Sequence, residues 1–189
     1  LMAATLAKRG RINDLWIKGN YPALSYITSM PVVISTSRIA LQNAIVRYYI
    51  PELSSVLLQH SVINTPLTCV LRKGKEHYLC EKRLRNHLRN EKDPGIREHL
   101  RSLLNKRFNI DLGEADEITP HTKSKINVMG RCDRDCPHFL RCRYLAFLKD
   151  AQSDRYDFQV CNHNYLLADV LRRKENQQPL IPHYQAVVI

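Results

Sequence analysis

The sequence predicts an α/β fold in which a largely α-helical insertion interrupts an open parallel sheet. Short apolar runs alternate with helical patterns near both ends of the 189-residue chain, which is typical of parallel α/β sheets. No convincing strand pattern occurs between residues 80 and 149. Four of the six cysteines fall inside that helical stretch, so the insertion is expected to have chemistry of its own.

The strands of the expected sheet are short. Apolar runs typical of buried parallel strands occupy residues 31–36, 67–71, 158–161 and 186–189. A helix is expected over 37–50, with an apolar face made of Leu41, Ala44, Ile45, Tyr48 and Tyr49. Another helix is expected over 164–172, and residues 10–30 are expected to form an irregular surface segment.

The insertion is expected to contain three helices. Residues 80–91 form a basic helical pattern in which Leu84 and Leu88 face inward. Asp93 and Pro94 are an N-cap and first-turn pair for a second helix. The apolar positions of that helix are Ile96, Leu100, Leu103, Leu104 and Phe108. Residues 109–131 are polar and expected to be rich in loops, and a third helix is expected from Pro137 through Leu148.

Composition and charge favour a polyanionic partner. The hydrophobic content of 44% is enough for a packed core. No run approaches the roughly 18 apolar residues of a membrane span, and no signal-peptide pattern is seen. An intracellular location is therefore expected, cytoplasmic in a bacterium and nuclear in a eukaryote. The net charge is +11, and residues 72–108 alone carry twelve basic against five acidic groups. This concentration favours nucleic acid, although a solvated helix surface gives the same pattern.

The cysteine spacing indicates an inorganic centre. Cys132, Cys136 and Cys142 lie within eleven residues of one another, and Cys80 opens the basic helix. Four thiolates suit either an iron–sulfur cluster or zinc. Structural zinc favours two close pairs of ligands, so one distant cysteine and a trio favour the cluster. His138 stands beside the trio, where a ligand or supporting role and a plain surface histidine both stay open.

The other two cysteines are expected to be structural. Cys69 and Cys161 lie inside apolar strand patterns. A buried free cysteine packs as a small hydrophobic side chain, so neither is placed in the site.

Four segments, in order along the chain, resemble the iron–sulfur superfamily-2 DNA helicases, the family of bacterial DinG and eukaryotic and archaeal XPD. Residues 32–42 (VVISTSRIALQ) resemble its motif Ia, and residues 73–80 (KGKEHYLC) resemble the lead-in to its first cluster cysteine. Cys132, Cys136-Pro137 and Cys142 resemble the other three ligands. Residues 160–167 (VCNHNYLL) resemble the V-x-N-H-x-L-L segment that returns to the motor domain. Lys75 and His77 depart from the family's usual Arg and Asn, and the match is closer to DinG than to XPD.

The resemblance implies a domain division and a cofactor. Residues 1–74 would belong to a RecA-like motor domain, 75–152 to an iron–sulfur domain, and 153–189 to the returning motor domain. Cys80, Cys132, Cys136 and Cys142 would hold a 4Fe-4S cluster. The chain would be an internal segment, because residues 1–8 would continue the helix after the Walker A motif and residues 186–189 would lead into the DEAH motif. The chain contains neither motif. ATP and Mg²⁺ would then bind only in the full-length parent, and no catalytic residue is expected here.

The resemblance also implies an activity for the parent, an ATP-dependent 5′–3′ DNA helicase of repair, replication or recombination. Its partners would be single-stranded DNA and DNA junctions, and the cluster would pin together helices too small for a large core. The candidate DNA contacts are Ser35, Thr36, Arg38, Gln42, Lys75, Tyr78, Arg83, Arg85, Arg89, Asn162 and His163. Helix capping is the competing role for Ser35, Thr36 and Asn162, and burial is the competing role for Tyr78.

Two other classes of function stay open from the sequence. One is a zinc-stabilised nucleic-acid-binding module without motor activity. The other is an iron–sulfur nuclease or primase subunit, which needs carboxylates for catalytic metal ions. Asp133 and Asp135 are the close acidic pair beside the cysteines, and they are better explained as partners of Arg131 and Arg134.

Overall fold

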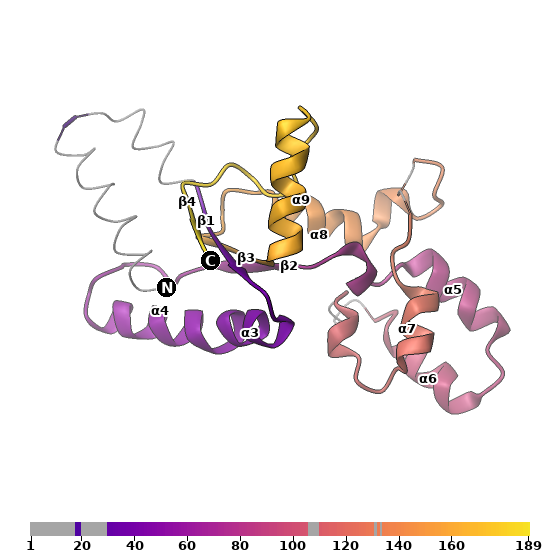
Figure 1. The fold of residues 1–189 in the computed structure, drawn as a ribbon. Helices are drawn as coiled ribbons and strands as arrows, with labels where there is room; N and C mark the ends of the chain where they lie inside the picture. Colours follow the sequence, from indigo (N-terminus) through magenta and orange to yellow (C-terminus); the bar gives the residue numbers. More distant parts are fainter. Residues whose placement is uncertain (1–17, 20–29, 106–109, 131, 133) are drawn as a thin grey trace. The chain divides into compact units, whose positions relative to one another are not determined.

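The fold is mixed α/β in a computed structural model that describes residues 18–19, 30–105, 110–130, 132 and 134–189 (Figure 1). The segment expected to be irregular, 10–30, lies largely outside the described residues, and so does Phe108. The chain divides into two compact units. The sheet unit is Leu1–Arg72 with Ala151–Ile189, and the inserted unit is Lys73–Asp150.

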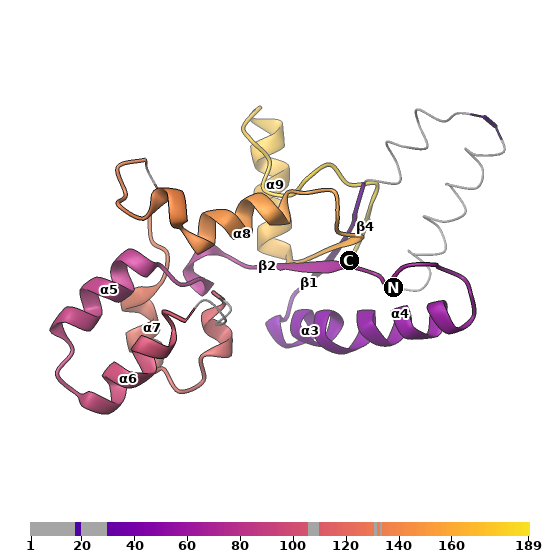
Figure 2. The same ribbon diagram turned by 180° about the vertical axis from the view of Figure 1, so that it is seen from behind.

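The sheet unit contains the expected parallel sheet. Its strands are β1 (Val32–Thr36), β2 (Cys69–Arg72), β3 (Phe158–Asn162) and β4 (Ala186–Val188), in the order β2-β3-β1-β4 (Figures 1 and 2). Every pairing is parallel. The side chains of β4 are exposed, so the expectation of a buried strand there is wrong. β4 lies at an edge of the described sheet and pairs with β1 alone.

Alternation along the strands divides the sheet unit into two apolar layers. Val32 and Ile34 face one side, where they pack with Ile45 and Ile50 of the helices that follow β1. Val33 faces the other side, toward α9 (His163–Lys174), as the period of two in a strand requires. Figures 1 and 2 show these helices on opposite faces of the sheet.

The helix after β1 differs from its expected form. It consists of α3 (Ile39–Ala44), a π-helical turn (Ile45–Tyr49) and α4 (Ile50–Gln59). The predicted apolar face is wrong in part, because Leu41, Tyr48 and Tyr49 are exposed whereas Gln42 is buried. The wide turn stands directly before Pro51, where a regular α-helix would lose a hydrogen bond and meet the proline ring. A π turn shifts the helical register, which a constant 3.6-residue period cannot foresee.

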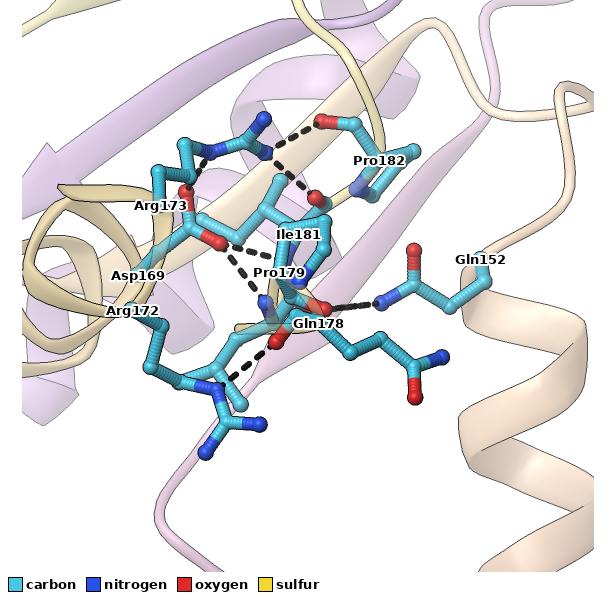
Figure 3. A network of polar contacts seen from close by, with 9 residues as sticks. Gln152, Asp169, Arg172, Arg173, Gln178, Pro179, Ile181 and Pro182 are labelled. Atoms are coloured by element: carbon cyan, nitrogen blue, oxygen red, sulfur yellow. Dashed lines mark hydrogen bonds and ion pairs between the residues drawn. The ribbon is translucent and has the colours of Figure 1, made fainter. Parts of the chain in front are cut away.

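A buried carboxylate fixes the segment that leads to β4. Asp169 of α9 accepts hydrogen bonds from the backbone N–H groups of Leu180 (2.7 Å) and Ile181 (2.9 Å). It also pairs with Arg173 at 2.6 Å, and the Arg173 guanidinium donates to the Ile181 carbonyl (Figure 3). Because the carboxylate is buried, these bonds replace the water that it loses on folding.

The inserted unit is helical, as expected. Its α-helices are α5 (Glu81–Asn90), α6 (Pro94–Ser102), α7 (Pro120–Ile126) and α8 (Arg143–Ala151), whose last residue already belongs to the sheet unit. Asp93 caps α6 through the backbone N–H of Ile96 at 2.9 Å, as its sequence predicts. The expectation of a loop over 109–131 is wrong at α7, where Thr119 is the N-cap and Pro120 the first residue.

The inserted unit has an apolar core of its own. The core contains Tyr78, Leu79, Leu84, Leu100, Leu103, Ile110, Leu112, Ala115, Ile118, Ile126 and Val128. The expectation that these helices are too small for a large core is therefore wrong. The core joins α5, α6 and α7, and Leu88 packs against it as expected.

None of the described helices combines the length and the apolar character needed to cross a bilayer.

Candidate metal centre

The four expected ligand cysteines converge on one pocket of the inserted unit. Cys80, Cys132, Cys136 and Cys142 all line it, although Cys80 is about fifty residues upstream of the trio. Apolar side chains complete most of the wall: Val128, Phe139, Tyr144 and Leu145. Four thiols in a largely apolar pocket are the donor set that an iron–sulfur cluster requires.

Local structure places two of these cysteines directly before helices. Cys80 is the N-cap of α5, and its backbone N–H donates to the Ile126 carbonyl at 2.8 Å. Cys142 precedes α8, and its carbonyl accepts from Ala146 at 2.9 Å. Cys136 lies in a turn that its carbonyl closes with the N–H of Phe139 at 2.9 Å. The prediction of a helix from Pro137 is therefore wrong: a short 3₁₀ turn, η4 (Phe139–Arg141), comes first.

Electrostatics at Cys132 show the mutual influence of the four thiols. The pKa of the Cys132 thiol is raised by partial burial and then by charges on Cys142, Cys80 and Cys136. The ammonium of Lys75 opposes them. Thiolates this close repel one another unless a cationic centre lies between them. Binding of a metal centre would therefore favour the deprotonated thiolate form of these cysteines.

Among the described residues, no group of three or more His, Cys, Asp or Glu side chains is arranged to hold a metal ion.

The two remaining cysteines lie in the sheet unit. Cys161 is buried in β3, and Cys69 is half-buried in β2. Burial raises the pKa of each thiol to about 11. Both pack with core side chains, so their placement matches a structural role.

The raised pKa values of the Cys69 and Cys161 thiols predict a labelling pattern for the six cysteines. At pH 8 a thiol with a pKa of about 11 is ionised in roughly one molecule in a thousand, and only the thiolate is alkylated. Iodoacetamide should therefore modify Cys80, Cys132, Cys136 and Cys142 once any bound metal is removed, while Cys69 and Cys161 react only after unfolding. Peptide mass spectrometry reads the result, and fast labelling of Cys161 in the folded chain would contradict it.

Three side chains of the inserted unit that were predicted to contact DNA instead make hydrogen bonds within that unit. Tyr78 is only 4% exposed, and its hydroxyl accepts from the backbone N–H of Lys73 at 3.0 Å, so base stacking by Tyr78 is wrong. Arg83 donates to the carbonyls of Lys125 (2.8 Å) and Ser124 (2.9 Å), where it caps the end of α7. Lys75 donates to the Gly130 carbonyl at 2.9 Å, in the loop before Cys132.

Two predicted contacts of the inserted unit do face outward. Arg85 and Arg89 are exposed and stand four residues apart on one face of α5. Within the described part of the chain, neither guanidinium makes a hydrogen bond or an ion pair. Among the predicted contacts of the inserted unit, they are the arginines that stay available to a phosphate backbone.

The predicted contacts of the sheet unit gather at the carboxyl ends of β1 and β3. The Ser35 hydroxyl lies 2.8 Å from Nδ1 of His163, and Asn162 caps α9 through the N–H of Tyr165 at 2.7 Å. The Thr36 hydroxyl donates to the Arg38 carbonyl at 3.1 Å. Capping and loop bonds thus occupy these side chains, whereas the Arg38 side chain is exposed.

Gln42 is a correction. Its side chain is fully buried, and its amide N–H lies 3.5 Å from the Thr36 carbonyl. It braces the loop after β1, so a direct contact between Gln42 and DNA is wrong.

Sequence reasoning missed three features of the inserted unit. Lys73 and Asp111 form a buried ion pair at 2.5 Å. Glu81 and Arg143, which follow Cys80 and Cys142 directly in the sequence, pair with each other. Leu140 is 95% exposed on η4. Adjacency to the ligand cysteines was an available signal for the second pair, but no local pattern indicates a partner 38 residues away for Lys73.

The sequence was compared with protein-family models and with curated proteins. Neither comparison finds a match.

Proposed function

We propose that this chain is the iron–sulfur-cluster-bearing, single-stranded-DNA-binding segment of an ATP-dependent 5′–3′ DNA helicase. The observation that carries the proposal is the convergence of Cys80, Cys132, Cys136 and Cys142 from separate segments on one pocket. The polarity and the motor come from the resemblance of four ordered segments to the DinG and XPD helicases. The chain itself contains neither a Walker A nor a DEAH motif, so ATP hydrolysis would belong to the parent.

The cluster, when bound, would cross-link the loop of Cys132 and Cys136 to the starts of α5 and α8. Cys80 and Cys142 present their thiols at helix N-termini, where the partial positive charge of the helix favours anionic groups. Apolar side chains make up much of the pocket wall, whereas Cys132 is exposed to solvent. Because the α5–α7 core is independent, the cross-link would order the loop from Gly130 to Cys142 rather than the whole unit.

DNA contacts in the inserted unit are assigned to exposed basic side chains. Arg85 and Arg89 of α5 would bind phosphates, and Arg134 and Arg141 line one pocket together with the exposed Leu140. Arginine binds phosphate through its planar fork, and an apolar side chain can contact base faces without reading sequence. Asp135 of the same loop is a carboxylate that limits its positive charge.

Charge reversal on α5 tests the DNA assignment. The double variant Arg85→Glu and Arg89→Glu should weaken binding to an oligothymidine strand and lower the slope of log K against log salt, because each lost phosphate contact removes about 0.7 from that slope. Fluorescence anisotropy at several salt concentrations measures both.

The control carries one Arg→Glu substitution, half the charge change of the double variant, elsewhere in the inserted unit. Arg101 of α6 is exposed and paired with Glu98, so Arg101→Glu should leave the slope near that of the unchanged chain. Equal slopes for all three proteins would remove α5 from the DNA path. The motor is tested separately by the full-length gene, which should encode Gly-Lys-Thr or Gly-Lys-Ser upstream and Asp-Glu-Ala-His downstream of this segment.

A further inference from the structure

The guanidinium of Arg143 joins three segments of the inserted unit. Arg143 follows Cys142 and begins α8, and its Nε donates to the carboxylate of Glu81. Its terminal nitrogens donate to the carbonyls of Leu103 (2.8 Å) and Asn105 (3.2 Å), just beyond the end of α6. One side chain therefore holds the start of α8 against the start of α5 and the end of α6.

Glu81 and Arg143 each follow a different cysteine of the candidate centre, Cys80 and Cys142, in the sequence. Glu81 follows Cys80 in the sequence and lines the thiol pocket. Its side chain is 17% exposed and that of Arg143 is 19% exposed, so both have lost most of their water. A half-buried carboxylate and guanidinium stabilise one another only as a pair, and loss of one leaves the other uncompensated.

The position of this pair matters for an anionic guest. A cluster with four thiolate ligands is negative overall, and a bare carboxylate in the pocket wall would repel it. Among the described residues that line the pocket, Glu81 is the carboxylate and Lys82 is a cation, and Arg143 pairs with Glu81. Because the net charge around a cluster sets its reduction potential, the pair also acts on that quantity.

We propose that Arg143 and Glu81 are positioning residues for the cluster, an inference that rests on the proposed function. Arg143 holds the segments of Cys80 and Cys142 together before the cluster enters, and it cancels the charge of Glu81 once the cluster is bound. Neither side chain is a ligand. Residues of this kind behind metal ligands are worth about 10–100-fold in metal affinity.

A double-variant cycle on the full chain tests both parts. Arg143→Gln exposes the cluster to a bare Glu81 and should lower its midpoint potential. Glu81→Gln leaves an unpaired cation and should raise the potential. The double variant Glu81→Gln with Arg143→Gln should return toward the unchanged chain, because both charges are gone. Reductive titration with dithionite, followed by electron paramagnetic resonance, measures the potential of the anaerobically reconstituted protein.

The hydrogen bonds by which Arg143 ties α8 to α5 and α6 have two readouts, amide exchange in the cluster-free protein and iron loss after reconstitution. Amide hydrogen exchange at residues 80–84 and 143–147 should accelerate in Arg143→Gln and in the double variant, and iron loss to a chelator should be about 10–100-fold faster after reconstitution. The control is Arg101→Gln, which removes an exposed, paired arginine of α6 and should change neither quantity.

The outcomes separate the two claims. Potentials that shift in the same direction for Arg143→Gln and Glu81→Gln, or no further than for Arg101→Gln, overturn the charge role, and unchanged exchange overturns the tie. If Arg143→Gln does not fold by circular dichroism, the rise in potential of Glu81→Gln alone decides the charge role. An unchanged chain that holds no iron would refute the proposed function, while the exchange of the cluster-free variants would still judge the tie.

Discussion

Cys136→Ser is expected to abolish the brown visible absorbance of the anaerobically purified chain and to remove nearly all of its iron. A serine hydroxyl is a much poorer iron ligand than a thiolate, and a cluster with three protein ligands loses iron readily. Cys136 lines the pocket with the other three thiols, and its carbonyl accepts a hydrogen bond from Phe139, the first residue of η4. Absorbance spectra and iron content measure the effect.

The same variant tests how far the cross-link reaches. Amide exchange should accelerate over residues 130–142 while the core amides of Leu84, Leu100 and Ile126 stay protected, because that core is apolar and continuous without the cysteine trio. The control is Cys69→Ala in β2, which should keep both colour and iron. Retention of full iron by Cys136→Ser would remove this residue from the ligand set.

Asp111→Asn is expected to destabilise the inserted unit by about 3–5 kcal/mol, the usual effect of leaving a buried charge without its partner. Lys73 and Asp111 pair at 2.5 Å, with side chains 5% and 10% exposed. The second carboxylate oxygen of Asp111 accepts from the N–H of Gly113 at 2.8 Å, and asparagine keeps that bond while losing the charge.

Denaturant unfolding of the cluster-free chain measures this effect, with exchange at the Leu79 amide as the local probe. That amide donates to the Ile110 carbonyl at 2.8 Å, next to Asp111, so it reports on the region directly. The matched control is Asp116→Asn at an exposed position, which should stay within about 0.5 kcal/mol of the unchanged chain. Equal stability of the two variants would show that the pair contributes little.

The sheet and several helix ends could be predicted from the sequence because their signals are local. The short apolar runs of β1 and β3 have no other economical explanation than buried parallel strands. Asp93-Pro94 caps α6 as its residue types require. In contrast, α7 has only seven residues and a polar sequence, so no apolar periodicity accompanied the capping signal of Thr119.

The meeting of the four cysteines could be predicted from the sequence, whereas the surroundings of the candidate site could not. Four cysteines of suggestive spacing do line one pocket. Whether a basic side chain is exposed or bonded inside the protein depends on groups far away in the sequence. Arg72 is buried against Gln159, and Arg83 caps a helix about forty residues away. A count of charges along the chain cannot separate these from Arg85, which is exposed.

Iron, zinc and acid-labile sulfide contents of the anaerobically purified chain test most directly whether four thiolates of the inserted unit hold one inorganic cluster. We expect about four irons and four sulfides per chain, with brown colour, as a 4Fe-4S centre requires. One equivalent of zinc in a colourless protein without sulfide would contradict the claim.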